Sequence, residues 1–450
     1  MVDPIQLSFL DDIESQKADQ KSYCLRDLGT FKDNIRSPIH NWFQYPAGYS
    51  YKFVEITFDM FGIKPGDWVY DPFSGTGTTL LCAKQQGING YGVEAHAFVH
   101  WVADVKLYWN YDFERLYQQL ESLLTRSAVY VSQAIENTSV DGIFPDLIYK
   151  CYHPEDLKAL YLLREFITHE PIESHLCDFL KLALTNTLRE SAAAGTGWPY
   201  VSPRKNTGNK PPKKAVAIFQ RTVRKMYTDL RAVVPYATRE STILNVLGDS
   251  RQQQNLEDAQ ISIAITSPPY LNNYDYADRT RLETYFWGIA KSWKEITEAF
   301  RKKLMVAATT QITRNHHQVD TALNREIEQI APEVYQTVQA AVMQLAKLRT
   351  QKGGKKDYDL MTALYFNDIL PVMRETHRVL KKGGQFCLVL GDSAPYGIHI
   401  PTEELIGQLG LGLGFRNFEY TELRKRGGKW KANPQRHNIP LREGIVTLTK

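Results

Sequence analysis

Apolar residues recur at two different spacings along the chain, and the spacing changes where glycines and prolines occur. Positions 53–63 repeat at helical spacing, and a Lys-Pro-Gly-Asp turn then precedes the short apolar run WVYDPF at 68–73. A second helical pattern at 78–86 stops at Gly87, before the apolar run GYGVEA at 90–95. A strand, a glycine-rich turn, a helix and a further strand in this order predict a βαβ unit with parallel strands.

The rest of the chain alternates between helical regions and strand patterns. From about 105 to 240 the apolar residues recur at helical spacing with few strand candidates, which predicts an inserted helical region. Strand patterns return at 241–249 and 259–270, and two further strand patterns close the chain. We therefore predict an α/β protein with a mostly parallel sheet and large helical insertions. The predicted segments are an N-terminal arm (1–35), a first sheet-forming segment (36–105), a helical insertion (106–240), a second sheet-forming segment (241–280), a second helical insertion (281–355) and a C-terminal segment (356–450).

Composition narrows the class of protein. Of the 450 residues 43% are hydrophobic, and the net charge of +4 is too small to indicate a nucleic-acid partner by itself. The five cysteines are scattered and form no Cys-x-x-Cys pair, which disfavours disulfides and zinc, so we predict no metal. The sequence shows neither a basic start followed by an apolar stretch nor an apolar run of about 18 residues, so we expect a cytoplasmic protein with no membrane partner.

A glycine-rich turn, DPFSGTGTT at 71–79, lies between a predicted strand and a predicted helix. Gly75 and Gly77 allow backbone conformations that other residues avoid, and they let a ligand approach the main chain closely. The turn lacks the Gly-Lys-Ser/Thr ending of a P-loop. Thr78 and Thr79 are placed to cap the helix and to offer hydroxyl groups.

Three acidic residues end three predicted strands. Asp71 is placed to accept hydrogen bonds from a ligand, and Glu94 can accept two from ribose hydroxyls, while Asp249 ends the third strand. Open α/β sheets bind ligands at the carboxyl ends of their strands, so these acids predict a ligand site. The alternative is that the glycines only form a tight turn and the acids only cap helices.

The stretch TSPPYLNNYDY, at 266–276, follows the apolar run ISIAI. Proline lacks the N–H group that a sheet needs, so the strand must end at Pro268 and Pro269. A rigid aromatic turn at the end of a strand favours a ligand platform. The alternative is a strand that ends at prolines, followed by a tyrosine packed in the core.

Together these stretches resemble the S-adenosylmethionine-dependent DNA amino-methyltransferases, which methylate the exocyclic amine of cytosine or adenine. The resemblance implies a Rossmann-like class I methyltransferase fold, in which an antiparallel strand closes the mostly parallel sheet. It also implies that S-adenosyl-L-methionine is the cofactor. By this resemblance the cofactor motif DPFxGxGTT falls on Asp71, Pro72, Phe73, Gly75, Gly77, Thr78 and Thr79, two further cofactor acids are Glu94 and Asp249, and the catalytic motif [DNS]PP[YFW] falls on Ser267, Pro268, Pro269 and Tyr270.

The resemblance also implies roles for the catalytic motif. The Ser267 hydroxyl and the Pro268 carbonyl would accept hydrogen bonds from the amine, and Tyr270 would stack on a flipped base. Tyr274 and Tyr276 would line the pocket, with simple packing as the alternative. Serine in the first position favours cytosine N4. Adenine N6, RNA as the substrate and a non-catalytic DNA-binding subunit remain alternatives. One departure is that the cofactor motif precedes the catalytic motif, whereas many SPPY cytosine enzymes have the reverse order.

Two basic segments are candidates for contacts with nucleic acid. The segment at 203–214, PRKNTGNKPPKK, combines basic residues with proline and glycine, as expected of a loop that contacts phosphates. The segment at 424–438 has a similar composition, and a solvated surface is the alternative for both. The predicted partners are double-stranded DNA, gripped and read by the helical insertions, and a separately encoded restriction enzyme or defence-system partner. The candidate phosphate-binding residues are Arg204, Lys205, Lys213 and Lys214.

Overall fold

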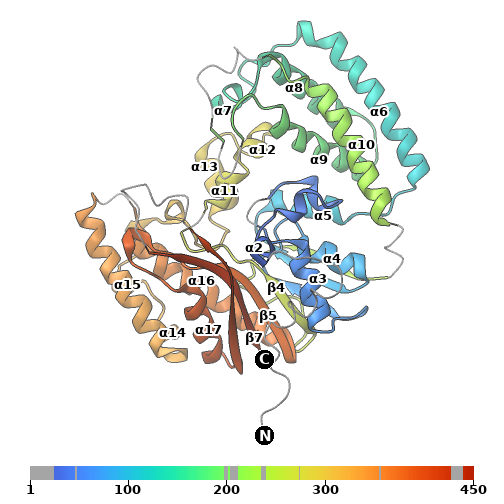
Figure 1. Ribbon diagram of the computed structural model, residues 1–450. Helices are drawn as coiled ribbons and strands as arrows, with labels where there is room; N and C mark the ends of the chain where they lie inside the picture. Colours follow the sequence, from blue (N-terminus) through green and yellow to red (C-terminus); the bar gives the residue numbers. More distant parts are fainter. Residues whose placement is uncertain are drawn as a thin grey trace.

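A seven-stranded sheet forms the centre of the protein in a computed structural model (Figure 1). The structure describes residues 25–45, 48–196, 201–202, 211–234, 240–272, 274–353, 356–426 and 439–450. The strands are β1 (Trp68–Asp71), β2 (Asn89–Glu94), β3 (Ile243–Leu247), β4 (Ile261–Thr266), β5 (Leu380–Gly391), β6 (Asn417–Arg426) and β7 (Leu441–Thr449). Their order is β3-β2-β1-β4-β5-β7-β6, and β7 runs antiparallel to both of its neighbours. The parallel strands β1 to β5 and the antiparallel β7 confirm the predicted Rossmann-like sheet.

Helices cover both faces of this sheet because successive strand residues point to opposite sides. Val69 of β1 packs in one apolar cluster with α3 and α4, whereas the adjacent Tyr70 packs in another with α16 and α17. The helices of the first face are α2 (Leu25–Leu28), α3 (Tyr51–Met60) and α4 (Thr78–Gln86), with α5 (Ala97–Leu107) beside α4. The second face carries α16 (Tyr358–Val379) and α17 (Thr402–Gly412), with α14 (Arg325–Ile330) and α15 (Pro332–Gln351) outside them.

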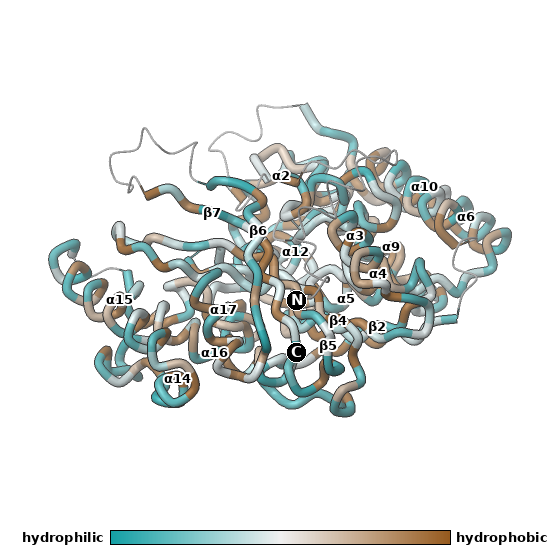
Figure 2. Tube along the Cα trace, turned by 60° about the horizontal axis from the view of Figure 1, so that its bottom comes forward, coloured by the Kyte–Doolittle hydropathy of each residue, from teal (hydrophilic) through white to brown (hydrophobic). Residues whose placement is uncertain are grey.

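A helical lobe stands beside the sheet, and it comes from the first predicted insertion (Figure 1). Its helices are α6 (Phe113–Ala134), α7 (Asp146–Tyr149), α8 (Pro154–His169), α9 (Ser174–Ser191) and α10 (Ala215–Val233). In Figure 2 hydrophilic and hydrophobic residues alternate along α6 and α10, as expected of helices with one buried face. Trp42 anchors the lobe, since its ring packs edge-on against Phe179 with centroids 5.5 Å apart and its indole N–H donates to Asp229 at 3.1 Å.

The chain after β4 forms short helices before it returns to the sheet. They are α11 (Tyr276–Arg279), α12 (Arg281–Phe286) and α13 (Trp293–Ile296), followed by a π-helical turn, η6 (Thr297–Arg301). The 3-10 turns are η1 (Asp33–Ile35), η2 (His40–Trp42), η3 (Ile135–Asn137), η7 (Thr309–Gln311), η8 (Arg314–His316) and η9 (Pro395–Gly397). Among the helices of the described ranges, none is long and apolar enough to cross a membrane.

A Gly-Gly pair at 383–384 follows the last long helical pattern, and this sequence predicts a turn before the next strand; that prediction is wrong. β5 begins at Leu380 and includes Gly383 and Gly384, so the pair lies within the strand. The register jumps from the pair Ile261–Leu380 to the pair Ile263–Gln385, and Gly383 has a φ of +81°. The glycines therefore form an irregularity inside the strand, where the positive φ lets the extra residues leave the ladder.

Candidate active site

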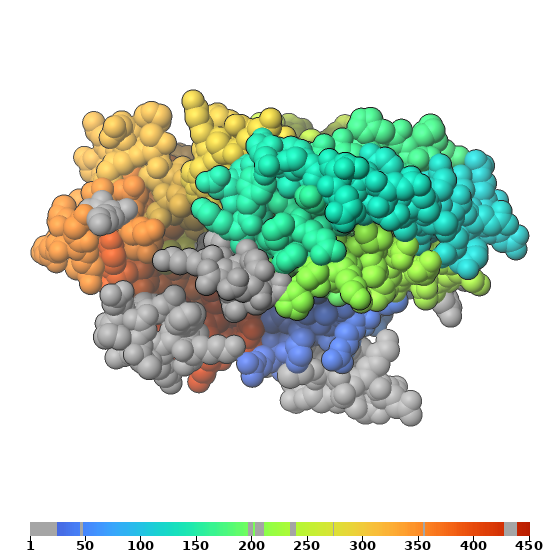
Figure 3. Space-filling model, turned by 90° about the horizontal axis from the view of Figure 1, so that it is seen from above, coloured from blue at the N-terminus to red at the C-terminus, as the bar shows by residue number. Residues whose placement is uncertain are grey.

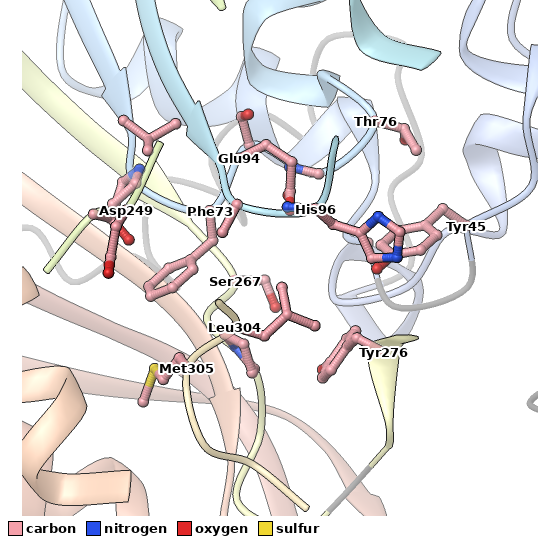
Figure 4. A pocket seen from close by; sticks show the side chains of 18 of the residues that line it. Tyr45, Phe73, Thr76, Glu94, His96, Asp249, Ser267, Tyr276, Leu304 and Met305 are labelled. Carbon is pink, nitrogen blue, oxygen red and sulfur yellow. The ribbon is translucent and has the colours of Figure 1, made fainter. Parts of the chain in front are cut away.

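A partly open cavity of about 860 Å³ lies at the carboxyl ends of the parallel strands. Figure 4 shows Asp249 and Met305 toward one end of it, Ser267 in the middle, and Tyr45 and Tyr276 toward the other end. The lining residues that the sequence predicted are Pro72, Phe73, Gly75, Thr78, Glu94, Asp249, Ser267 and Pro269. Four strands, β1 to β4, therefore bring the predicted glycine turn, two acids and the proline turn to one cavity.

The glycine turn adopts the backbone that the sequence predicted. Gly75 and Gly77 have φ values of +53° and +79°, in the left-handed region that favours glycine. A Cβ atom on Gly77 would also lie 3.3 Å from the Cβ of Ala103. The predicted threonine cap was wrong, because Gly77 itself occupies the N-cap of α4 and Thr78 is already the first helical residue.

Asp71 lies behind the cavity wall and is buried. Its carboxylate accepts hydrogen bonds from Thr266 Oγ1 at 2.7 Å, Tyr49 Oη at 2.8 Å and the backbone N–H of Phe73 at 3.1 Å. Tyr49 is also hydrogen-bonded to Thr79. Burial raises the pKa of Asp71, and these hydrogen bonds oppose that shift. The Asp71 carboxylate thus ties the glycine turn to β4 and to the N-terminal segment, with its oxygens already engaged by the protein.

Glu94 faces the cavity and holds the glycine turn in place. Its Oε2 accepts the backbone N–H of Gly75 at 3.0 Å, and its Oε1 accepts the backbone N–H of His96 at 2.7 Å. Burial raises the pKa of Glu94 to about 7, and these two N–H groups oppose the shift. Each carboxylate oxygen has a further lone pair, so Glu94 can accept hydrogen bonds from two more donors in the cavity.

Asp249 is held in a fixed orientation by an arginine from its own turn. Arg251 Nε lies 2.9 Å from Asp249 Oδ1, and Arg251 Nη2 lies 2.8 Å from Oδ2. Arg251 also pairs with Asp368 on α16, with 3.0 Å between Nη1 and Oδ1. This bidentate geometry fixes the plane of the Asp249 carboxylate at the edge of the cavity.

The proline turn is divided between the cavity and the core. Ser267 and Pro269 line the cavity, whereas Pro268 is buried and Tyr270 is only 8% exposed. The guanidinium group of Arg426 lies over the Tyr270 ring, 5.4 Å from its centroid. The pKa of Tyr270 is raised well above its ordinary value, mainly by burial. Tyr270 is therefore not among the residues that line the cavity, and Arg426 lies over its ring.

Aromatic residues further along the same stretch approach the cavity more closely. Tyr276, the first residue of α11, lines it. The half-buried Tyr274 packs edge-on against Tyr276, with ring centroids 6.0 Å apart, and is not among the lining residues. Tyr276 is therefore the tyrosine of this stretch that a ligand in the cavity would meet.

His96 is a lining residue that the sequence analysis missed. Its ring stacks on Phe300 with centroids 4.1 Å apart, and its Nε2 lies 2.9 Å from Thr280 Oγ1. Burial lowers the pKa of His96 to about 3, so the ring is neutral at physiological pH. Its only sequence signal is its position two residues after Glu94. Leu304 and Met305 also line the cavity, and they come from the second insertion, where no motif marks them.

The predicted basic residues lie away from this cavity or outside the described residues. Lys213 and Lys214 are exposed where α10 begins, and Lys213 Nζ donates to the Glu190 carbonyl at 3.0 Å. Neither lysine lines the cavity. Arg204 and Lys205 lie outside the described residues.

Comparisons with known proteins agree with this geometry. A family described as DNA methylase, of the N6/N4 type, matches residues 27–103. Type II methyltransferase M.BsoBI of Geobacillus stearothermophilus is 23% identical over 94% of this chain and 88% of its own length. Type II methyltransferase M.AvaI of Nostoc sp. is 23% identical over 87% of this chain and 82% of its own length. Type II methyltransferase M.MjaII of Methanocaldococcus jannaschii is 39% identical over 14% of this chain. The chain is thus similar to DNA methylases of the N6/N4 type over residues 27–103 and to Type II methyltransferases over most of its length, and with the Rossmann-like sheet this supports an amino-methyltransferase of that type.

Proposed function

We propose that this protein transfers a methyl group from S-adenosylmethionine to the exocyclic amine of a base in double-stranded DNA, with cytosine N4 as the favoured position. The observation that carries the proposal is that Ser267 of the proline turn and Glu94 beside the glycine turn line one cavity. A methyl donor and an acceptor amine must meet within van der Waals contact, and a shared cavity permits this. The Type II methyltransferases that resemble the chain support the choice of DNA.

The lining residues fit S-adenosylmethionine. The positive φ angles of the glycine turn leave the main chain open to a close ligand, which suits the methionine part. The free lone pairs of Glu94 suit the two ribose hydroxyls, and Asp249 with Phe73 suits the adenine. When bound, the cofactor would supply an electrophilic methyl group on a sulfonium.

The proline turn would activate the acceptor amine. An exocyclic amine is a poor nucleophile because its lone pair is delocalised into the ring, and hydrogen-bond acceptors aimed at its protons favour the tetrahedral nitrogen of the transition state. The Ser267 oxygen and the Pro268 carbonyl would be these acceptors. The target base must leave the duplex to reach them. Tyr276 is better placed than the covered Tyr270 to contact it. Serine in place of aspartate at position 267 supports cytosine N4.

The test is to incubate the protein with methyl-labelled cofactor and double-stranded DNA, digest the DNA to nucleosides and identify the labelled nucleoside. We expect N4-methylcytosine. Labelled N6-methyladenine would contradict the choice of cytosine but would still agree with a DNA amino-methyltransferase. Label found only in RNA, in a parallel incubation, would overturn DNA as the substrate.

Cofactor affinity is expected to rise with pH because of Glu94. The pKa of Glu94, about 7, lies above the ordinary 4.5 because burial destabilises the charged carboxylate. Between about pH 4.5 and pH 7 the folded protein therefore keeps a proton on Glu94 that the unfolded chain has lost. The unliganded protein should therefore lose stability as pH rises through this window. Ribose hydroxyls would donate to the ionised form, so affinity for S-adenosylhomocysteine should increase about tenfold from about pH 6 to about pH 8. Calorimetric titration measures this, and Glu94→Gln should flatten the profile. An equally steep profile in Glu94→Gln would show that another group titrates.

A further inference from the structure

A second cavity, of about 1280 Å³, lies between the N-terminal segment and the helical lobe. Gln44 lines it from the N-terminal segment, Arg189 from α9, Lys225 from α10 and Arg279 from α11. Figure 3 shows the blue N-terminal segment directly against the yellow-green α10. The cavity therefore joins the helical lobe to the helix that follows the proline turn.

Arg279 is buried beside this cavity with much of its hydrogen-bonding capacity unused. Its side chain is only 7% exposed, and its Nη2 donates to the Gln44 carbonyl at 2.7 Å. Its Nε and Nη1 have no hydrogen-bond partner among the described residues, and the nearest carboxylate, that of Glu283, lies 4.0 Å from Nη1. A buried guanidinium group with unused donors is costly unless an anion completes its surroundings.

The carboxylate near Arg279 is already occupied by another arginine. Arg189 Nε and Nη2 bond to the two oxygens of Glu283 at 2.5 and 3.0 Å, and the Glu283 side chain is fully buried. Two guanidinium groups thus share one carboxylate. Burial, together with the charge of Arg189, lowers the pKa of Arg279 to about 10. A lowered pKa is expected of a buried cation whose charge the neighbouring carboxylate balances only in part.

The other charges around the cavity balance one another. Lys225 Nζ pairs with Asp229 at 2.8 Å, and it also donates to Asn41 at 2.6 Å. Glu190 pairs with Arg221. Among the described residues, the surplus positive charge at this cavity is therefore that of Arg279 beside the Arg189–Glu283 pair.

We propose that this cavity is an oxyanion site that takes a phosphodiester of the DNA backbone, with Arg279 as its principal ligand; this inference rests on the proposed function. A phosphodiester carries one negative charge, which matches the surplus, and the unused N–H groups of Arg279 Nη1 can donate a charge-assisted hydrogen bond to one of its oxygens. Arg279 lies one helical turn after Tyr276, which lines the first cavity. A phosphate bound here would therefore hold the DNA strand at a fixed offset from the reacting base.

The test measures DNA binding in the presence of S-adenosylhomocysteine, so that it does not depend on turnover. Arg279→Gln should weaken binding about tenfold and reduce the slope of log affinity against log salt by about one. Its affinity for S-adenosylhomocysteine should stay unchanged. Arg224→Gln is the matched control, because Arg224 is an exposed arginine paired with Glu121 on the outside of the lobe, and it should leave the slope unchanged.

A change in the DNA tests the site on the native protein, in case Arg279→Gln does not fold. Methylphosphonates, which are neutral, replace single phosphates on each side of the target base. One position should weaken binding by the wild type about tenfold, and where Arg279→Gln folds this loss should be absent from it. If no position does so, or if the salt slope of Arg279→Gln equals that of the wild type, the site is wrong. If the wild-type protein binds DNA through this phosphate but methylates none of it, the phosphate site stands and the proposed function is overturned.

Discussion

Ser267→Ala is expected to slow methyl transfer by about 100- to 1000-fold and to leave cofactor affinity unchanged. Ser267 follows β4 directly and lines the cavity beside Pro269. Its hydroxyl would accept a hydrogen bond that strengthens as the amine becomes tetrahedral, so its loss should raise the barrier without weakening the ground state. Single-turnover transfer of labelled methyl gives the rate, and calorimetry with S-adenosylhomocysteine gives the affinity.

The matched control for this variant lies on β4, the strand that Ser267 follows. The hydroxyl of Ser262 donates to Asp67 at 2.9 Å, and Ser262 is not a lining residue. Ser262→Ala also removes one serine hydroxyl, but at a position outside the cavity, so this variant should transfer methyl at the rate of the wild type. Equal rates in Ser267→Ala and Ser262→Ala would exclude Ser267 from the reaction.

The second large effect concerns stability. Asp275→Ala should lower the free energy of unfolding by about 3–5 kcal/mol. Asp275 is 5% exposed, and its Oδ2 accepts hydrogen bonds from Arg301 Nε at 2.9 Å and Thr310 Oγ1 at 2.8 Å. Arg301 is 2% exposed, so removing the carboxylate leaves a buried guanidinium group without its counter-charge. Urea denaturation followed by circular dichroism measures the loss.

Two further variants separate the ion pair from a general effect of substitution. The double variant Asp275→Ala/Arg301→Met removes the unpaired charge and keeps most of the volume, so it should regain part of the lost stability. Lys302→Ala removes an exposed ion pair with Glu298 on the same turn and should cost about 0–1 kcal/mol. A cost for Asp275→Ala as small as that for Lys302→Ala would show that the buried pair does not hold the second insertion to the proline turn.

The parts of the site that the sequence could predict are those fixed by local backbone rules. Gly75 and Gly77 were predictable because a strand followed directly by a helix needs positive φ angles there. Glu94 and Asp249 were predictable because parallel strands end at one edge of the sheet, so residues just after them must lie together. Ser267 followed from the same rule, since prolines must end β4.

The direction of individual side chains was not predictable, because distant segments decide it. Tyr270 turns into the core, where Arg426 of β6 covers its ring. Asp71 is engaged by Tyr49, which belongs to a segment outside the motif. The surroundings of Arg279 come from Gln44 and Arg189, which the chain places far from it in sequence. Periodicity describes the faces of single elements and carries no information about such contacts.

The place of the helical lobe in the chain also bears on how the protein folds. β2 ends at Glu94 and its neighbour β3 begins at Ile243, so the whole lobe must be looped out before these two strands can pair. The lobe has many local helical contacts, whereas the β2–β3 ladder is long-range and therefore slow to form. Glu94 and Asp249 consequently meet only when the sheet closes. A ligand that contacts both acids therefore binds only the protein in which the sheet has closed. By mass action, a higher ligand concentration then stabilises the closed sheet.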